Sequence, residues 1–114
     1  MDTVIEYRKG ILFIRLIGNL TKETCPLLEK EVNHIIKEYQ IKNIVINLEK
    51  LKTVDMKGIN ILYYIYELSK KNKGRVLISD LSNEEVRKRL KKSRLLNYIK
   101  EIQNELVAFK LIQV

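Results

Sequence analysis

The sequence predicts an α/β protein with a mixed, mainly parallel sheet of about five strands, helices packed on that sheet, and an antiparallel N-terminal hairpin. Short β-branched, apolar runs alternate along the chain with segments of helical periodicity, a pattern that favours crossover connections between parallel strands. The first two apolar runs are separated only by a short turn containing Gly10, which favours an antiparallel pair. The length of 114 residues predicts one domain, residues 1–114.

The N-terminal hairpin is predicted from two apolar segments. Residues 4–7 and 11–17 are rich in β-branched and aromatic side chains, and Lys9 and Gly10 lie between them. The segment 18–21, Gly-Asn-Leu-Thr, has turn composition and is expected to end the second strand.

The first helix is predicted to begin near Pro26, which suits a first turn because the missing N–H has no helical partner there. Either Thr21 or Thr24 can cap it. His34 falls beside the apolar stripe without a partner in sequence, and is expected to be a surface or boundary residue. The residues expected to face the core recur at helical spacing: Leu28, Val32, Ile35, Ile36 and Tyr39.

The middle of the chain contains the most apolar elements. Residues 43–48 are apolar on both faces, as in a parallel strand covered from two sides. A second helix is predicted from Met56 or Lys57 to Lys71, where it ends before a glycine. Residues 75–79 form another short apolar strand.

The C-terminal third contains two predicted helices and one strand. Residues 82–85, Ser-Asn-Glu-Glu, match a capping box that begins with the serine and starts a third helix. Residues 98–102 are a predicted strand, and Asn104 can cap a final helix over 105–112. Residues 106–114 are also compatible with a strand, so both alternatives stay open.

The net charge of +8 is concentrated in one part of the chain. Residues 70–100 hold eleven Lys or Arg and three Asp or Glu, and the remaining residues sum to zero. Such a field could attract nucleic acid, an anionic membrane or an acidic protein. A solvated helical face is favoured, because charge runs on helices usually face water. Residues 84–94 also contain no aromatic side chain on which bases could stack. Nucleic acid and membrane are therefore not the expected partners.

Several function classes are not expected. The chain has one histidine and one cysteine, Cys25, without catalytic or metal-ligand spacing, and no glycine-rich phosphate motif. No apolar run is long enough to span a bilayer, the N-terminus lacks a secretory pattern, and a lone cysteine fits a reducing compartment. We therefore expect a cytoplasmic protein that is not an enzyme and uses no cofactor or metal.

Five segments, in this order and spacing, are similar to a known family. Residues 11–20 match a second strand with its turn, and residues 41–51 match a central strand with its loop. Asp55-Met56-Lys57-Gly58 follows, and residues 76–79 and 93–99 match later segments. Together they cover nearly the whole chain and resemble the STAS domain of bacterial anti-sigma factor antagonists.

The resemblance implies a regulatory protein that binds an anti-sigma factor or a GHKL-type kinase. In such proteins the kinase phosphorylates a serine just before the loop glycine, and the added charge ends binding. Here that position is Lys57. The two acidic residues of the family's nearby turn are replaced by Asn19 and Thr21. The partner-binding residues that the resemblance and the adjoining helix indicate are Asn19, Thr21, Asp55, Met56, Lys57, Gly58, Asn60 and Tyr63.

Lys57 predicts that the usual phosphorylation switch is absent, so that binding is constitutive or directed at a more acidic partner. Thr53 and Thr21 are the nearest remaining hydroxyls, although a loop threonine and a helix cap explain them better. A second hypothesis is a non-switching STAS subunit that binds other subunits of a signalling scaffold or a lipid-transport complex. A basic binder of nucleic acid or membrane surfaces is the third.

The second helix is apolar on more than one side, which indicates either deep burial or contact with a partner. Ile61, Ile65 and Leu68 share one helical face, whereas Ile59, Tyr63 and Tyr66 form another stripe. Because tyrosine is enriched in interface hot spots, an interface is slightly favoured over core for the second stripe. Asn60 stands where the family usually has a small residue and is expected to affect partner choice.

Overall fold

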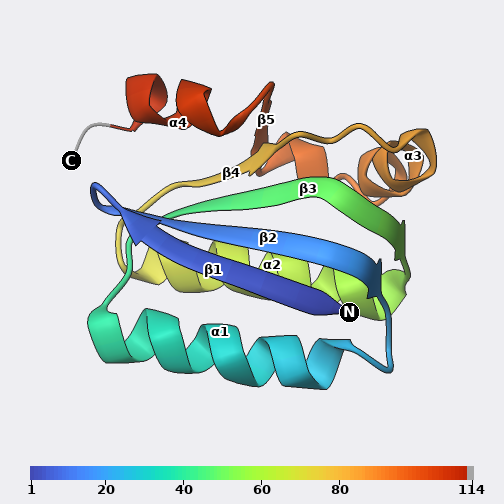
Figure 1. Cartoon of the computed structure of the whole chain (residues 1–114), viewed down its shortest axis with the longest axis horizontal. Coiled ribbons are helices and arrows are strands. Elements are labelled where there is room, and N and C mark those ends of the chain that lie inside the picture. The colour runs from blue at the N-terminus through green and yellow to red at the C-terminus, as the bar shows by residue number, and fades with distance from the viewer. Residues whose placement is uncertain (113–114) are drawn as a thin grey trace.

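The computed structural model describes residues 1–112, which form a five-stranded sheet of order β1-β2-β3-β4-β5 (Figure 1). β1 (Asp2–Arg8) pairs antiparallel with β2 (Ile11–Leu20). β3 (Asn43–Val54), β4 (Val76–Ser79) and β5 (Lys100–Ile102) are added in parallel. The mixed, mainly parallel sheet and its N-terminal hairpin are confirmed.

Helices cover the two faces of the sheet unequally (Figure 1). α1 (Cys25–Tyr39) and α2 (Met56–Lys71) lie side by side on one face, and α3 (Glu84–Lys92) adds to the same core. A 3-10 helix, η1 (Leu95–Asn97), follows α3. α4 (Glu105–Leu111) is the helix on the opposite face.

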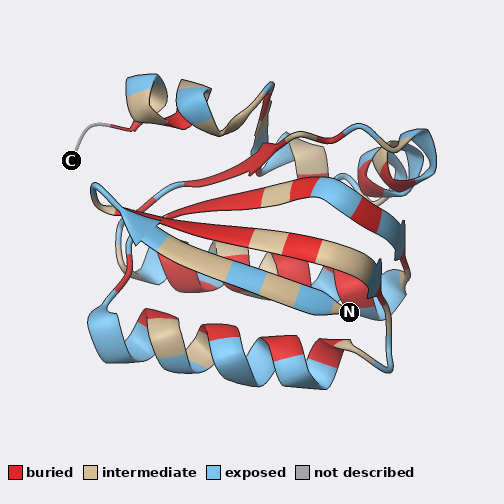
Figure 2. Ribbon diagram, viewed as in Figure 1, coloured by how far each residue is buried: buried red, intermediate tan, exposed pale blue. Residues whose placement is uncertain are grey.

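The central strands are buried on both faces, as their apolar pattern predicts (Figure 2). The larger core lies between the sheet and α1, α2 and α3, with Ile14, Ile46 and Leu62 fully buried. Each such side chain stabilises the fold by roughly 1.5–3 kcal/mol relative to exposure. A smaller cluster lies under α4 and comprises Ile11, Phe13, Val45, Leu77, Ile102, Ala108 and Ile112.

β2 and β3 continue past the strand ends predicted at residues 17 and 48, and pair as far as Leu20 opposite Val54. β4 ends opposite Asn47, so the rest of β3 has a neighbour only in β2. Its outward side chains are therefore exposed and polar, and the apolar pattern stops although the strand does not. The turn predicted at residues 18–21 is instead a register irregularity beside Gly18, whose φ is +108°.

The end of α1 differs from the predicted buried stripe. Tyr39 is 69% exposed and Ile35 only half-buried. The helix stops at Gln40, which adopts a left-handed conformation, and the N–H of Ile41 donates to the Ile36 carbonyl at 3.1 Å. This turn directs Ile41 inward, where it is 4% exposed and closes the core that Tyr39 was expected to cover.

Of the caps predicted for α1 and α3, one has the correct position and one does not. Thr24 is the N-cap of α1, but its side chain does not cap the helix, because its hydroxyl oxygen accepts a hydrogen bond from the Thr21 N–H at 2.9 Å while the hydroxyl donates to the Asn19 carbonyl at 2.7 Å. The N-cap of α3 is Asn83 rather than Ser82. The Asn83 side-chain oxygen accepts a hydrogen bond from the N–H of Glu85 at 2.9 Å, which satisfies a free donor of the first turn.

The C-terminal segment is helical. Asn104 caps α4 as predicted, accepting a hydrogen bond from the N–H of Val107 at 3.3 Å. The alternative strand over 106–114 is wrong for its described part, and residues 113–114 lie outside the described residues. β5 starts at Lys100 rather than 98, because η1 and its C-cap Tyr98 occupy the preceding positions.

Candidate partner-binding site

The loop between β3 and α2 is tied to the loop between β2 and α1 by Asp55. This residue is the N-cap of α2, and its carboxylate accepts hydrogen bonds from the N–H of Gly58 at 2.8 Å and of Lys22 at 2.9 Å. Burial raises the pKa of Asp55, but backbone hydrogen bonds from Gly58, Lys22 and Lys57 outweigh it and hold that pKa below its ordinary value. The two loops therefore form one surface.

Gly58 fixes the approach of α2 to the sheet. A Cβ atom here would lie within 2.5 Å of the Leu20 carbonyl oxygen and 2.8 Å from a Val54 methyl carbon. The residue belongs to the first turn of α2 rather than to a loop, and it is buried. Gly58 thus positions its neighbours, and other side chains form the accessible surface.

Met56, Lys57 and Asn60 are exposed on the first turns of α2, and Met56 is 68% exposed. Lys57 and Asn60 line a groove of about 490 Å³ between the N-terminal ends of α1 and α2. The other lining residues are Lys22, Cys25, Pro26, Glu29, Ile61 and Tyr64. The groove thus has apolar walls, and its charged lining residues are two lysines and one glutamate.

The contribution of α1 to this groove was missing from the sequence interpretation. Tyr64, on α2, donates its hydroxyl to Asn33 of α1 at 2.7 Å and so joins the two helices. Burial raises the pKa of the Cys25 thiol, which keeps it in the unreactive, protonated form. The only available signal was the apolar spacing of both helices, which does not show that they are neighbours.

Asn19 and the two threonines lie beside Asp55 on the same surface. The Thr53 hydroxyl donates to the Asn19 side-chain oxygen at 2.9 Å, and the Thr21 hydroxyl donates to Glu23 at 3.0 Å. Thr53 and Asn19 are exposed, and Thr21 is half-buried. The residues predicted near the loop are therefore brought together, and both hydroxyls have partners.

Tyr63 is the predicted site residue that lies apart from the loop. Its hydroxyl donates to the Ser93 carbonyl at 2.9 Å, and its ring centroid is 5.9 Å from that of Tyr98. Burial and the neighbouring Tyr98 raise the pKa of the Tyr63 hydroxyl, and Arg94 opposes the rise. Ile59, expected on the same stripe, is 5% exposed and belongs to the core.

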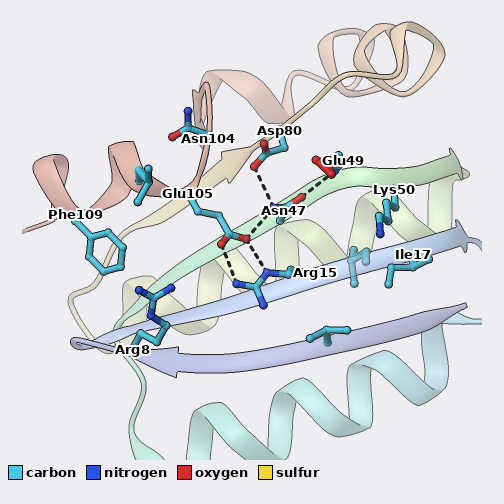
Figure 3. Close-up of a pocket in the computed structure, with 13 residues that line it drawn as sticks. Arg8, Arg15, Ile17, Asn47, Glu49, Lys50, Asp80, Asn104, Glu105 and Phe109 are labelled. Atoms are coloured by element: carbon cyan, nitrogen blue, oxygen red, sulfur yellow. Dashed lines mark hydrogen bonds and ion pairs between the residues drawn. The ribbon is translucent and has the colours of Figure 1, made fainter.

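A second cavity, of about 550 Å³, lies on the other face of the sheet beside α4 (Figure 3). Two guanidinium nitrogens of Arg15 donate to the Glu105 carboxylate at 2.8 Å each, and Asn47 donates to Glu105 at 2.7 Å and Asp80 at 3.0 Å. The Arg15 hydrogen bond lowers the pKa of Glu105 most strongly; burial opposes this. These polar groups satisfy one another, so the network supports the docking of α4.

Within residues 1–112, no helix is both long and apolar enough to cross a bilayer. In the same part of the chain, no group of His, Cys, Asp or Glu side chains is arranged to hold a metal ion.

The comparisons with known proteins agree with this fold. The anti-sigma F factor antagonist of Paenibacillus polymyxa is 26% identical over 110 residues, covering 96% of this chain and 93% of that protein. An anti-sigma factor antagonist from Mycobacterium paratuberculosis superimposes with a TM-score of 0.82 at 20% identity, covering 97% and 92% of the two chains. The phosphorylated form of SpoIIAA, a Bacillus cell fate determinant, superimposes with a TM-score of 0.75 at 19% identity, covering 97% of this chain and 100% of that chain.

A mixed sheet with an antiparallel hairpin, and a capped helix N-terminus beside its central strand, define a small α/β binding domain. The family model of the STAS domain matches residues 2–108, and the chain belongs to this family.

Proposed function

We propose that this chain is a single regulatory STAS domain of the cytoplasm that acts as an anti-sigma factor antagonist without being an enzyme. It binds an anti-sigma factor or a GHKL-type kinase through the Asp55–Gly58 segment and the exposed start of α2. The usual serine phosphorylation does not control this binding. The observation that carries the proposal is Lys57, an exposed lysine at the rim of the groove between α1 and α2.

The electrostatics of this surface favour an acidic partner. The N-terminus of α2 carries the partial positive charge of a helix end, and Asp55 satisfies one of its free N–H groups. Lys57 and Lys22 add two cations at the same place. Because an amine is not a substrate for serine phosphorylation, Lys57 keeps its positive charge where the family's serine would become negative.

The shape of the groove supports an apolar anchor. A volume of about 490 Å³ is within the range of small-molecule sites, and its walls include Ile61, Pro26 and Tyr64. A partner residue with an aliphatic side chain fits such a floor, and a neighbouring carboxylate would face Lys57. Thr53 and Thr21 remain weak candidates for phosphorylation, since the hydroxyl of each already donates a hydrogen bond.

Calorimetric titration against the purified anti-sigma factors of the same organism tests this proposal. We expect Lys57→Glu to weaken binding by at least about tenfold, because it places a carboxylate opposite an acidic partner. Lys50→Glu is the matched control, since Lys50 lines the cavity on the opposite face of the sheet (Figure 3). Equal loss in the two variants would contradict docking at the loop.

The absence of the switch has its own test. After incubation with the kinase, ATP and Mg²⁺, mass spectrometry should find no phosphate on the wild-type chain and one phosphate on Lys57→Ser. Phosphate on wild-type Thr53 or Thr21 would show that the acceptor has moved. If no anti-sigma factor binds but other STAS subunits do, the chain is a non-switching member of a larger assembly.

A further inference from the structure

Three tyrosines from two separate elements form an exposed cluster on the flank of α2 that faces η1. Tyr63 and Tyr66 come from α2, and Tyr98 follows η1. The Tyr98 ring centroid is 5.9 Å from that of Tyr63 and 6.0 Å from that of Tyr66. Tyr98 is nevertheless 59% exposed, and the other two rings are half-buried. Helical spacing predicted that Tyr63 and Tyr66 share a stripe, but not that Tyr98 joins them, because Tyr98 is distant in sequence.

Cations border the tyrosine cluster on two sides. The Lys70 ammonium lies 5.6 Å from the centre of the Tyr66 ring, and the exposed Arg94 directly follows Ser93, whose carbonyl accepts a hydrogen bond from the Tyr63 hydroxyl. The last turn of α3, which leads to Arg94, carries Lys91 and Lys92, whereas Arg89 lines a cavity beside Asp55 and Thr53. One exposed carboxylate, Glu67, neighbours Tyr66 in sequence. We call Tyr63, Tyr66, Lys70, Arg94 and Tyr98 the tyrosine patch.

The tyrosine patch is separate from the Lys57 surface. At about 100° per residue, Tyr63 and Tyr66 point roughly 120–180° around α2 from Lys57. Tyr64 and Asn60 share the flank of Lys57 and line the groove against α1. The tyrosine patch instead contacts the segment after α3, where Tyr63 donates to the Ser93 carbonyl. A partner at the groove therefore leaves the tyrosine patch free.

We propose that the tyrosine patch binds an acidic, partly apolar segment of a partner protein. Positive charge beside exposed rings is complementary to carboxylates interspersed with apolar side chains. Tyrosine and arginine are also the side chains most enriched in binding hot spots. Binding at the tyrosine patch goes beyond the antagonist role, because it adds a second protein contact on the other flank of α2.

Two other anionic partners fit the tyrosine patch less well. The rings of Tyr63 and Tyr66 meet Tyr98 at 66° and 60°, so they offer no parallel platform for successive bases. A membrane-surface site calls for a broad exposed apolar face, with several large side chains such as Trp, Phe or Leu beside the cations. Among residues 1–112, the large apolar side chains that are exposed lie elsewhere, apart from Tyr98.

An NMR titration of the ¹⁵N-labelled chain with a short peptide of alternating Glu and Leu tests the proposal. We expect salt-sensitive shifts in the amides of 63–70 and 93–99, and no comparable shifts with the matching Gln-Leu peptide. Tyr98→Ala and Arg94→Glu should each weaken binding by at least about tenfold, and Arg94→Lys should retain most of it. Tyr98 is exposed, so its removal is compatible with folding, which the same spectra verify.

Two control variants separate this proposal from the antagonist role. Lys50→Glu should leave the peptide-induced shifts of 93–99 unchanged, because Lys50 lies outside both the tyrosine patch and the groove. Lys57→Glu should remove any peptide-induced shifts along the groove and leave those of 93–99 in place. Equal weakening by Lys50→Glu, or shifts spread over every lysine, would overturn the proposal. Tighter Tyr98-dependent binding to phosphatidylglycerol vesicles or to oligo-dT would overturn the assignment of an acidic polypeptide. Neither result would affect anti-sigma factor binding at Lys57.

Discussion

The Asp55 carboxylate accepts a hydrogen bond from the backbone N–H of Lys22 at 2.9 Å, across 33 positions of sequence. The other carboxylate oxygen accepts one from the N–H of Gly58, so a single side chain caps α2 and holds the preceding loop against it. The cap is therefore also what keeps Lys22 and Lys57 at the rim of one groove.

Replacing Asp55 by alanine should remove both hydrogen bonds. We expect a loss of about 1–2 kcal/mol in the free energy of unfolding, typical of a lost N-cap, measured by urea denaturation. Asp55→Asn is the control, since its side-chain oxygen can still cap the helix. An alanine variant as stable as the asparagine variant would show that the cap contributes little.

Gly58→Ala should be more damaging than its small size suggests. The added methyl would meet the Leu20 carbonyl oxygen, which belongs to backbone and cannot rotate away. We expect a loss of about 1–3 kcal/mol from overpacking, with partner binding reduced because α2 must shift. Asn60→Ala, an exposed change on the same helix, should alter the unfolding free energy by less than about 0.5 kcal/mol.

Glu105 should make stability depend on pH. Its pKa is lowered in the folded protein, so its contribution is present above the unfolded pKa and is lost as pH falls through the folded pKa. Glu105→Gln should therefore cost about 1–2 kcal/mol at neutral pH and progressively less in acid. Urea unfolding of both chains from neutral to acidic pH measures this, and a pH-independent difference would contradict it.

Tyr63→Phe should weaken the fold without affecting the groove. The variant loses the hydrogen bond to the Ser93 carbonyl, for an expected cost of about 0.5–1.5 kcal/mol. Binding at the Lys57 surface should stay unchanged, because Tyr63 faces η1. Thermal unfolding and calorimetric titration check the two parts, and reduced anti-sigma factor binding would place Tyr63 in that interface.

The sequence by itself determined the order of elements, the hairpin, the sheet class and the presence of Lys57 where the family has a phosphorylatable serine. These follow from local periodicity, turn composition and residue identity, which do not require knowledge of distant neighbours. Hence residues 43–48 could be recognised as a doubly covered strand, and Asn104 as a cap.

Tertiary contacts decided the rest. The end of β3 is exposed and carries polar side chains because β4 stops at Ser79. Tyr39 is exposed because Ile41 occupies the core position that Tyr39 was expected to cover. The groove depends on α1 packing beside α2, and the tyrosine patch on η1 returning to α2. Periodicity shows which face of an element is apolar, but the element that covers that face, or leaves it open, is determined only when the chain is packed.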